Sequence, residues 1–194
     1  MFDQVSIIGC GLIGSSIFKG LKKGGSIKKI ITYDKDKSVT EIIKKENLSD
    51  GIFNSASESV KNSDLVIIAT PISSFESVLN SIKDNLKTGS ILTDTCSVKK
   101  GVGKIFDKIK LKNSICIPGH PVAGIENSGP KAGVADLFKG RWTILTPNKN
   151  IDQKAVKKVT NFWELLGSKV KIMSDEDHDK ILSFSSHLPH AIAY

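Results

Sequence analysis

Short apolar segments alternate with amphipathic segments along most of the chain. The apolar runs, which are bounded by turn residues, predict strands at about 4–8, 27–33, 64–70, 90–94, 114–118, 142–145 and 169–172. Apolar residues at helical spacing predict one helix from the end of the first turn to about 23, and others at about 38–45, 73–85, 98–109 and 153–166. The run DLVIIAT at 64–70 is typical of a strand buried on both faces of a parallel sheet. This alternation predicts an α/β fold with a doubly wound, mostly parallel sheet.

Two segments depart from the alternation. Residues 119–133 are rich in glycine and proline and are predicted to form a loop. From Ser174, a predicted helix N-cap, a helical pattern continues to Tyr194 without a terminating glycine, and Pro189 is expected to kink it. We therefore predict one domain at 1–173 and, at 174–194, the first helix of a truncated all-α domain.

Length and composition are those of an ordinary folded protein. The 194 residues, 39% hydrophobic and 25% charged, can form one sizeable core and begin a second. No run approaches the roughly 18 uncharged apolar residues of a membrane span, and the first apolar run lacks the basic lead of a secretory signal. The three cysteines lack the spacing of a zinc site or a disulfide framework, and we expect buried, reduced thiols. The expectation is a cytoplasmic protein that does not bind membranes.

The net charge of +8 raises the question of nucleic-acid binding. Only one of the 28 basic residues is an arginine, Arg141, and the lysines are scattered. Specific reading of bases relies on arginine and on a clustered basic surface. The pattern favours a solvated, lysine-rich surface over a nucleic-acid partner, and such a surface also attracts an anionic substrate.

A GxGxxG motif follows the first predicted strand and opens a helix. Gly9 permits a tight turn, Gly11 lets a pyrophosphate approach the backbone, and Gly14 lets the helix pack close to the sheet. Leu12 and Ile13 lie at the helix start, where N–H groups face the phosphates. This context predicts a Rossmann-type dinucleotide-binding domain at 1–173. The alternative is a glycine turn without a ligand.

An acidic residue ends the second predicted strand, as dinucleotide binding requires. Asp34 lies 20 residues after the last glycine of the motif, where it is expected to bind the adenosine ribose and to repel a 2′-phosphate. This predicts NAD as the cofactor. Lys35 and Lys37 are able to accommodate a 2′-phosphate, so NADP stays open. Thr70 and Pro71, at the end of the strand predicted at 64–70, are expected to complete the cofactor site.

Three further motifs complete the pattern. They are DTCSVK at 94–99, GHPVAGIENSG at 119–129, and SHLPH at 186–190, which His178 and Asp179 precede. The first two follow predicted strands, at the edge of the sheet where α/β proteins bind ligands. Together with GxGxxG, they resemble the prephenate and arogenate dehydrogenase family over essentially the whole chain. The last two motifs, in this order, are the specific part of the resemblance.

The resemblance implies an NAD(P)-dependent oxidoreductase of tyrosine biosynthesis. Such an enzyme converts prephenate to 4-hydroxyphenylpyruvate, or arogenate to tyrosine, as hydride leaves ring C4 for the nicotinamide and CO2 is lost. His120 is implied as the base that takes the C4 hydroxyl proton, Ser97 as the residue that fixes its geometry, and His190 as a catalytic residue near the substrate. Glu126 and Ser186 are implied as further substrate contacts. The resemblance also implies a homodimer through the C-terminal helical region.

Some of these residues also have a purely structural interpretation. Ser97 can be only the N-cap of the helix at 98–109. His187 and His190 are three residues apart on a predicted helix, a spacing that suits a metal, but no third ligand accompanies them. No metal site is therefore predicted. The arginine that binds the ring carboxylate in the family has no matching position here, because Arg141 lies outside the motifs.

Two other functions also fit a GxGxxG domain. One is a Rossmann dehydrogenase of the β-hydroxyacid type, which normally has a catalytic lysine on the helix after its substrate loop. The other is a non-catalytic nucleotide-binding module. The motifs at 119–129 and 186–190 favour the prephenate and arogenate reactions over the first of these.

Overall fold

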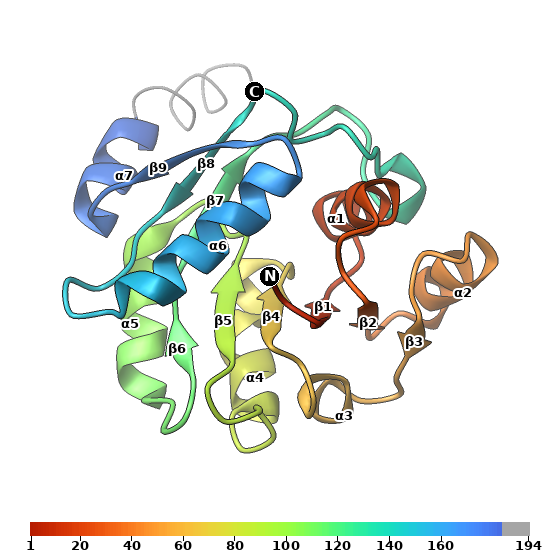
Figure 1. Cartoon of the computed structure of the whole chain (residues 1–194), viewed down its shortest axis with the longest axis horizontal. Helices are drawn as coiled ribbons and strands as arrows, with labels where there is room; N and C mark the ends of the chain where they lie inside the picture. The colour runs from red at the N-terminus through yellow and green to blue at the C-terminus, as the bar shows by residue number, and fades with distance from the viewer. Residues whose placement is uncertain (184–194) are drawn as a thin grey trace.

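The computed structural model describes residues 1–183, which form two sheets (Figure 1). The larger sheet has six strands in the order β3-β2-β1-β4-β5-β6, and all its neighbouring strands are parallel. The strands are β1 (Gln4–Ile8), β2 (Lys29–Tyr33), β3 (Gly51–Ile52), β4 (Leu65–Ile68), β5 (Ile91–Asp94) and β6 (Ile115–Cys116). This order is the Rossmann arrangement, in which ligands bind where the strand order reverses, here between β1 and β4. The predicted fold class is confirmed.

Helices cover both faces of this sheet (Figure 1). The helices on one face are α1 (Leu12–Gly24), α2 (Lys37–Lys45) and α6 (Gln153–Leu165). Those on the other face are α3 (Ala56–Val60), α4 (Ile72–Ile82) and α5 (Lys99–Ile109). Strand β4 shows why its whole sequence is apolar. Leu65 and Ile67 pack into the first cluster and Val66 and Ile68 into the second, so both faces of the strand are buried.

The smaller sheet corrects one prediction. Its strands are β7 (Gly119–Val122), β8 (Trp142–Leu145) and β9 (Lys169–Ile172), with β7 antiparallel to β8 and β8 parallel to β9. Residues 119–133 were expected to form a loop throughout, but the first four of them form β7. Glycine and proline lower strand propensity, and only pairing with a strand 20 residues further along the chain stabilises β7 there. Later in this segment lies a short 3₁₀ helix, η1 (Pro130–Ala132).

Other differences are local. The short elements β3 and α3 carry no clear periodic signal and were not predicted. Helix α2 is capped by Asp36, whose carboxylate accepts a hydrogen bond from the Ser38 N–H at 2.8 Å, so the helix begins one residue before the predicted 38. The prediction for Ser174 is confirmed, because its hydroxyl accepts from the Asp177 N–H at the start of α7 (Asp175–Leu182). The rest of the predicted last helix, with Pro189, lies outside the described residues. Among residues 1–183, no helix has the length and apolar character needed to cross a membrane.

One carboxylate joins the start of the chain to the start of β4. Asp64 accepts hydrogen bonds from the Asp3 N–H at 2.9 Å and the Gln4 N–H at 3.1 Å, and Lys87 Nζ donates to its other oxygen at 2.5 Å. Burial opposes ionisation of Asp64, but these donors outweigh it and hold the pKa of Asp64 below its ordinary value.

This geometry predicts an acid-dependent contribution to stability. We expect Asp64→Asn to lower the free energy of unfolding at pH 7 by about 1–3 kcal/mol. Because the folded-state pKa is the lower one, the contribution is complete above the unfolded pKa of about 3.9 and is lost as the pH falls through the folded pKa. Urea denaturation of both proteins between pH 7 and pH 3 measures the difference. Asp84→Asn, at an exposed carboxylate, is the control, and a difference that stays constant with pH would contradict the prediction.

Candidate functional site

The turn between β1 and α1 has the geometry that the three glycines predict. Gly9 has φ of 93°, and a Cβ atom there would lie 2.7 Å from the carbonyl oxygen of Ala69. A Cβ atom on Gly14 would collide with the carbonyl oxygen of Gly9, so α1 packs directly against the turn. At Gly11, by contrast, a Cβ atom would meet nothing within 4 Å. The backbone of the turn is therefore open on the side where a pyrophosphate would bind.

A cavity of about 170 Å³ adjoins this turn. Five of the eight predicted cofactor residues line it: Gly9, Gly11, Asp34, Thr70 and Pro71. The Thr70 hydroxyl is buried and has no hydrogen-bond partner within residues 1–183. The remaining predicted cofactor residues, Leu12, Ile13 and Gly14, do not line this cavity, and the first two pack against the core.

The carboxylate at the rim of this cavity is fixed by the backbone. Asp34 accepts hydrogen bonds from the Cys10 N–H at 2.7 Å and the Asp36 N–H at 2.9 Å, one on each oxygen. Lys35 lines the same cavity. The cavity thus presents a held negative charge with a neighbouring cation, beside the open glycine turn.

A buried ion pair organises the carboxyl edge of the sheet. Lys99 Nζ lies 2.5 Å from Asp94 Oδ2, and both side chains are 0% exposed. Lys99 Nζ also donates to the Gly119 carbonyl at 2.7 Å, and the Gly119 N–H donates to Asp94 Oδ1 at 3.1 Å. The Asp94–Lys99 ion pair therefore joins the end of β5, the start of α5 and the start of β7. His120, the next residue of β7, is placed by these contacts.

His120 belongs to a chain of hydrogen bonds that the sequence did not reveal. Its Nδ1 lies 2.9 Å from Nε2 of His178, and Nδ1 of His178 lies 2.7 Å from Oδ1 of Asp179. His120 is 8% exposed and His178 is fully buried. In the sequence, His178 and Asp179 are only neighbours of the last motif. The signal it lacked is spatial, because α7 folds back onto α5 and β7.

Asp179 has a second function at the start of α5. Its carboxylate accepts hydrogen bonds from the N–H groups of Lys99 at 2.8 Å and Lys100 at 2.9 Å. Burial opposes ionisation of Asp179, but these two donors and His178 outweigh it and hold the pKa of Asp179 below its ordinary value. Because the N-cap residue of α5 is Val98, which makes no side-chain capping bond, the prediction of Ser97 as the cap is wrong. A carboxylate from α7 takes the place of a local cap.

The predicted substrate residues are only partly described. Ser97 is exposed in the turn between β5 and α5, and Glu126 is exposed in the segment after β7. Ser186, His187 and His190 lie outside the described residues. Substrate contacts by Ser97 and Glu126 stay predictions, and His120 is the predicted catalytic residue whose surroundings the structure defines.

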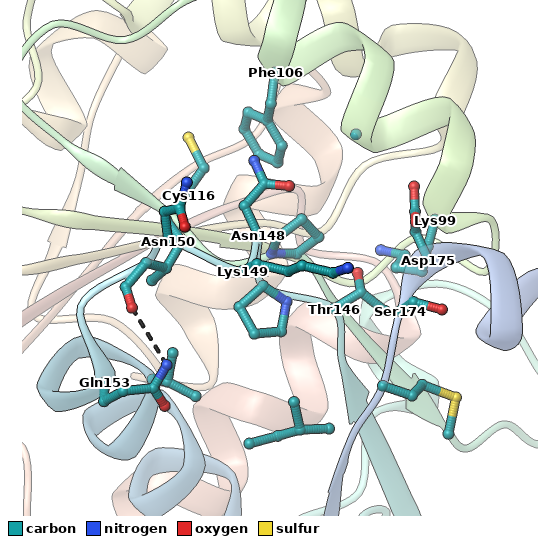
Figure 2. A pocket seen from close by; sticks show the side chains of 17 residues that line it. Lys99, Phe106, Cys116, Thr146, Asn148, Lys149, Asn150, Gln153, Ser174 and Asp175 are labelled. Atoms are coloured by element: carbon teal, nitrogen blue, oxygen red, sulfur yellow. Dashed lines mark hydrogen bonds between the residues drawn. The ribbon is translucent and has the colours of Figure 1, made fainter.

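A larger cavity, of about 820 Å³, is lined by a different set of residues. Figure 2 shows Lys99, Thr146 and Asp175 among its lining side chains, between α5, the segment after β8 and the start of α7. None of the predicted site residues that the structure describes lines it. Cavity size therefore does not single out the predicted cofactor residues, which line the smaller cavity beside the glycine turn.

The described residues offer no metal centre. Within 1–183, no three His, Cys, Asp or Glu side chains are grouped as metal ligands. Cys10, Cys96 and Cys116 are free thiols, and burial raises the pKa of each to about 12. These cysteines are therefore protonated thiols near neutral pH.

Comparisons with known proteins agree with this geometry. Residues 17–172 match the family described as "Prephenate dehydrogenase, nucleotide-binding domain". Cyclohexadienyl dehydrogenase of Zymomonas mobilis is 38% identical over 100% of this chain and 66% of its own length, and prephenate dehydrogenase of Bacillus subtilis is 32% identical over 100% and 52%. The chain thus spans between half and two thirds of these curated relatives.

Solved structures show the same likeness. Prephenate dehydrogenase of Aquifex aeolicus, in complex with hydroxyphenyl propionate and NAD+, matches with a TM-score of 0.89 and 32% identity, over 100% of this chain and 67% of that one. Arogenate dehydrogenase of Synechocystis matches with a TM-score of 0.88 and 26% identity, over 96% and 65%.

The buried ion pair predicts that substitutions of the neighbouring residues Lys99 and Lys100 differ strongly in their effect on stability. We expect Lys99→Met to lower the free energy of unfolding by about 3–5 kcal/mol, because it leaves the buried Asp94 carboxylate without its partner. Lys100→Met, whose exposed ion pair with Glu176 is solvent-screened, should cost about 1 kcal/mol or less. Urea denaturation measures both. The double variant Asp94→Asn/Lys99→Met should lose less than the sum of its two single variants. Equal losses of unfolding free energy in the two lysine variants would show that the buried ion pair does not stabilise the fold.

Proposed function

The chain belongs to the prephenate dehydrogenase family, and from this membership we propose that it binds NAD and supplies the base for oxidative decarboxylation of prephenate, or of arogenate. The observation that carries the proposal is His120. It is a buried histidine on β7, beside the carboxyl end of β5, and the Asp94–Lys99 ion pair and His178 hold it in place. Because the chain spans about two thirds or less of its curated relatives, the activity of the whole protein is part of the proposal.

The described residues fit a nicotinamide dinucleotide. When bound, NAD accepts a hydride from the substrate ring. The turn at Gly9–Gly14 would hold the pyrophosphate at the start of α1, and the Thr70 hydroxyl offers a buried partner to the cofactor. Asp34 would accept from the ribose hydroxyls, and its charge would disfavour a 2′-phosphate. Lys35 reduces that discrimination without reversing it, so we propose NAD as the preferred cofactor.

His120 would act as the general base. An imidazole with an ordinary pKa of about 6.5 accepts a proton near neutral pH, and such transfer contributes about 10²–10⁴-fold to a rate. The proton of the C4 hydroxyl would pass to His120 as the hydride leaves C4. Loss of the ring carboxylate as CO2 would then give an aromatic phenolate, which makes the reaction favourable, and return of the proton from His120 would give the phenol. Ser97, Glu126, Ser186 and His190 complete the proposed site as substrate contacts, on the basis of the motif resemblance alone.

Three further parts of the proposal rest on the same resemblance. The segment at 174–194 is proposed as the first part of a helical region beyond the nucleotide-binding domain at 1–173. Homodimerisation through that region is proposed for the full-length protein, and sedimentation velocity tests it. A cytoplasmic location is proposed because tyrosine biosynthesis uses soluble metabolites.

The His120 proposal is tested by turnover and binding together. We expect the full-length protein to form NADH with prephenate or with arogenate, followed by absorbance at 340 nm. His120→Asn should reduce turnover by about 10²-fold or more, while the NAD dissociation constant, measured by calorimetry, stays the same. Turnover that survives the substitution would remove His120 from the mechanism. NAD binding without turnover on either substrate would favour a non-catalytic nucleotide-binding module.

Cofactor choice gives a separate prediction. We expect Asp34→Asn to weaken NAD binding about tenfold, because a charged hydrogen-bond acceptor is lost, and to weaken NADP binding less. Asp36→Asn is the matched control, since this exposed carboxylate two residues away caps α2 and does not line the cavity. Calorimetric titration with both cofactors measures the ratio of the NADP and NAD dissociation constants. A ratio that is the same in Asp34→Asn and in the unchanged protein would exclude Asp34 as the discriminating residue.

A further inference from the structure

We propose that Asp179 and His178 are positioning residues that hold neutral His120 in the tautomer protonated at Nδ1, so that Nε2 is its proton-accepting nitrogen. The tautomer follows from the contacts of these three residues when His178, like His120, is neutral. Its catalytic consequence rests on the proposed function of His120.

The first step is the direction of the hydrogen bond at Asp179. An ionised carboxylate only accepts hydrogen bonds. Asp179 receives two backbone N–H groups at the start of α5, where the helix dipole also favours a negative charge, so it stays ionised near neutral pH. In its 2.7 Å contact with His178, the Nδ1 atom of His178 must therefore donate.

The direction of the hydrogen bond at His178 determines the direction of the next one, at His120. A neutral imidazole has one N–H group and one acceptor nitrogen. Because Nδ1 of His178 donates to Asp179, Nε2 of His178 is the acceptor. The contact of 2.9 Å between that atom and Nδ1 of His120 then requires His120 to donate from Nδ1. The unprotonated nitrogen of neutral His120 is therefore Nε2, the atom on the other side of its ring.

Burial strongly favours this direction of the hydrogen bond, from Nδ1 of His120 to Nε2 of His178. His178 is 0% exposed, so water does not readily replace a lost partner. The opposite tautomer of His120 would place two acceptor nitrogens against each other in the interior, which leaves both without a hydrogen bond. If the His178 ring were rotated, or if both of its hydrogen bonds ran in the opposite direction, the Asp179 carboxylate would lose its side-chain donor.

Both ends of this chain of hydrogen bonds are attached to the same helix start. Asp179 is held by the N–H groups of Lys99 and Lys100, and the backbone of Gly119, next to His120, is held by the Lys99 side chain. Lys99 thus fixes the position of the base through Gly119 and the position of the orienting carboxylate through its own N–H. The His120 ring is held from two sides by one residue of α5.

The reaction step balances with this assignment. The proton of the substrate hydroxyl would pass to Nε2 of His120 while bound NAD accepts the hydride, and loss of the ring carboxylate as CO2 would leave a phenolate. His120 would then carry N–H groups on both nitrogens, with its Nδ1–H still donating to His178, until Nε2–H returns its proton to the phenolate oxygen. In the serine proteases a carboxylate that fixes the tautomer of the catalytic histidine by direct contact contributes about 10⁴-fold, and here the orienting effect of Asp179 would pass through His178.

The tautomer is measured directly by NMR on the 194-residue chain. The protein has four histidines, so long-range ¹H–¹⁵N spectra of a ¹⁵N-labelled sample, taken near pH 8.5 with single His→Gln variants for assignment, identify each ring. We expect His120 and His178 both to be protonated at Nδ1. In His178→Leu, His120 should lose this preference. His178→Gln retains a carbonyl oxygen that accepts from Nδ1 and should restore it. A His120 ring protonated at Nε2 in the unchanged protein would overturn the proposal.

Kinetics of the full-length protein test the consequence. His178→Leu should lower kcat by about 10²–10⁴-fold with little change in KM or NAD affinity, and His178→Gln should recover part of the loss. Asp175→Asn, at another carboxylate of the same helix, is the control and should leave kcat unchanged. An unchanged kcat in His178→Leu would refute the positioning role. If the unchanged enzyme fails to turn over, the proposed function fails, while the NMR result still decides the tautomer.

Discussion

The buried ion pair between Asp94 and Lys99 is the contact on which the rest of the site depends. Removing two charges from water is costly, and their attraction offsets that cost only when the geometry is good and the remaining hydrogen-bonding groups are satisfied. Here backbone groups of Cys96 and Gly119 complete the pair. The requirement for full satisfaction fixes three chain segments relative to one another. A hydrophobic pair of equal size would pack there without specifying that arrangement.

The fold was predictable because its signals are local. A strand buried on both faces must be apolar throughout, and β4 shows this in four consecutive residues. The glycine turn was predictable because a close approach of backbone atoms excludes any side chain at Gly9 and Gly14, whatever else the chain does. Asp34 is predictable in the same way, because its position at the end of β2 follows from the spacing of the βαβ unit.

The site was less predictable because its contacts join distant parts of the chain. His120 and His178 are 58 residues apart in sequence, and Asp179 and Lys99 are 80 apart. No periodicity or turn signal reports which carboxylate will reach a helix start from another element, so a local cap at Ser97 was the natural expectation. Strand β7 was missed for the same reason, because its glycine and proline are acceptable only beside β8. Motif spacing located His120 but did not define its partners.

The capping of α5 from α7 has a consequence for how the molecule assembles. Most helices carry their cap within their own sequence, so they are complete before they meet their neighbours. Helix α5 is not complete by itself, because its first N–H groups have hydrogen-bond acceptors only when α7 packs against it. The same docked helix carries His178 against His120, so the completed start of α5 and the aligned histidine depend on one and the same contact between elements far apart in the sequence.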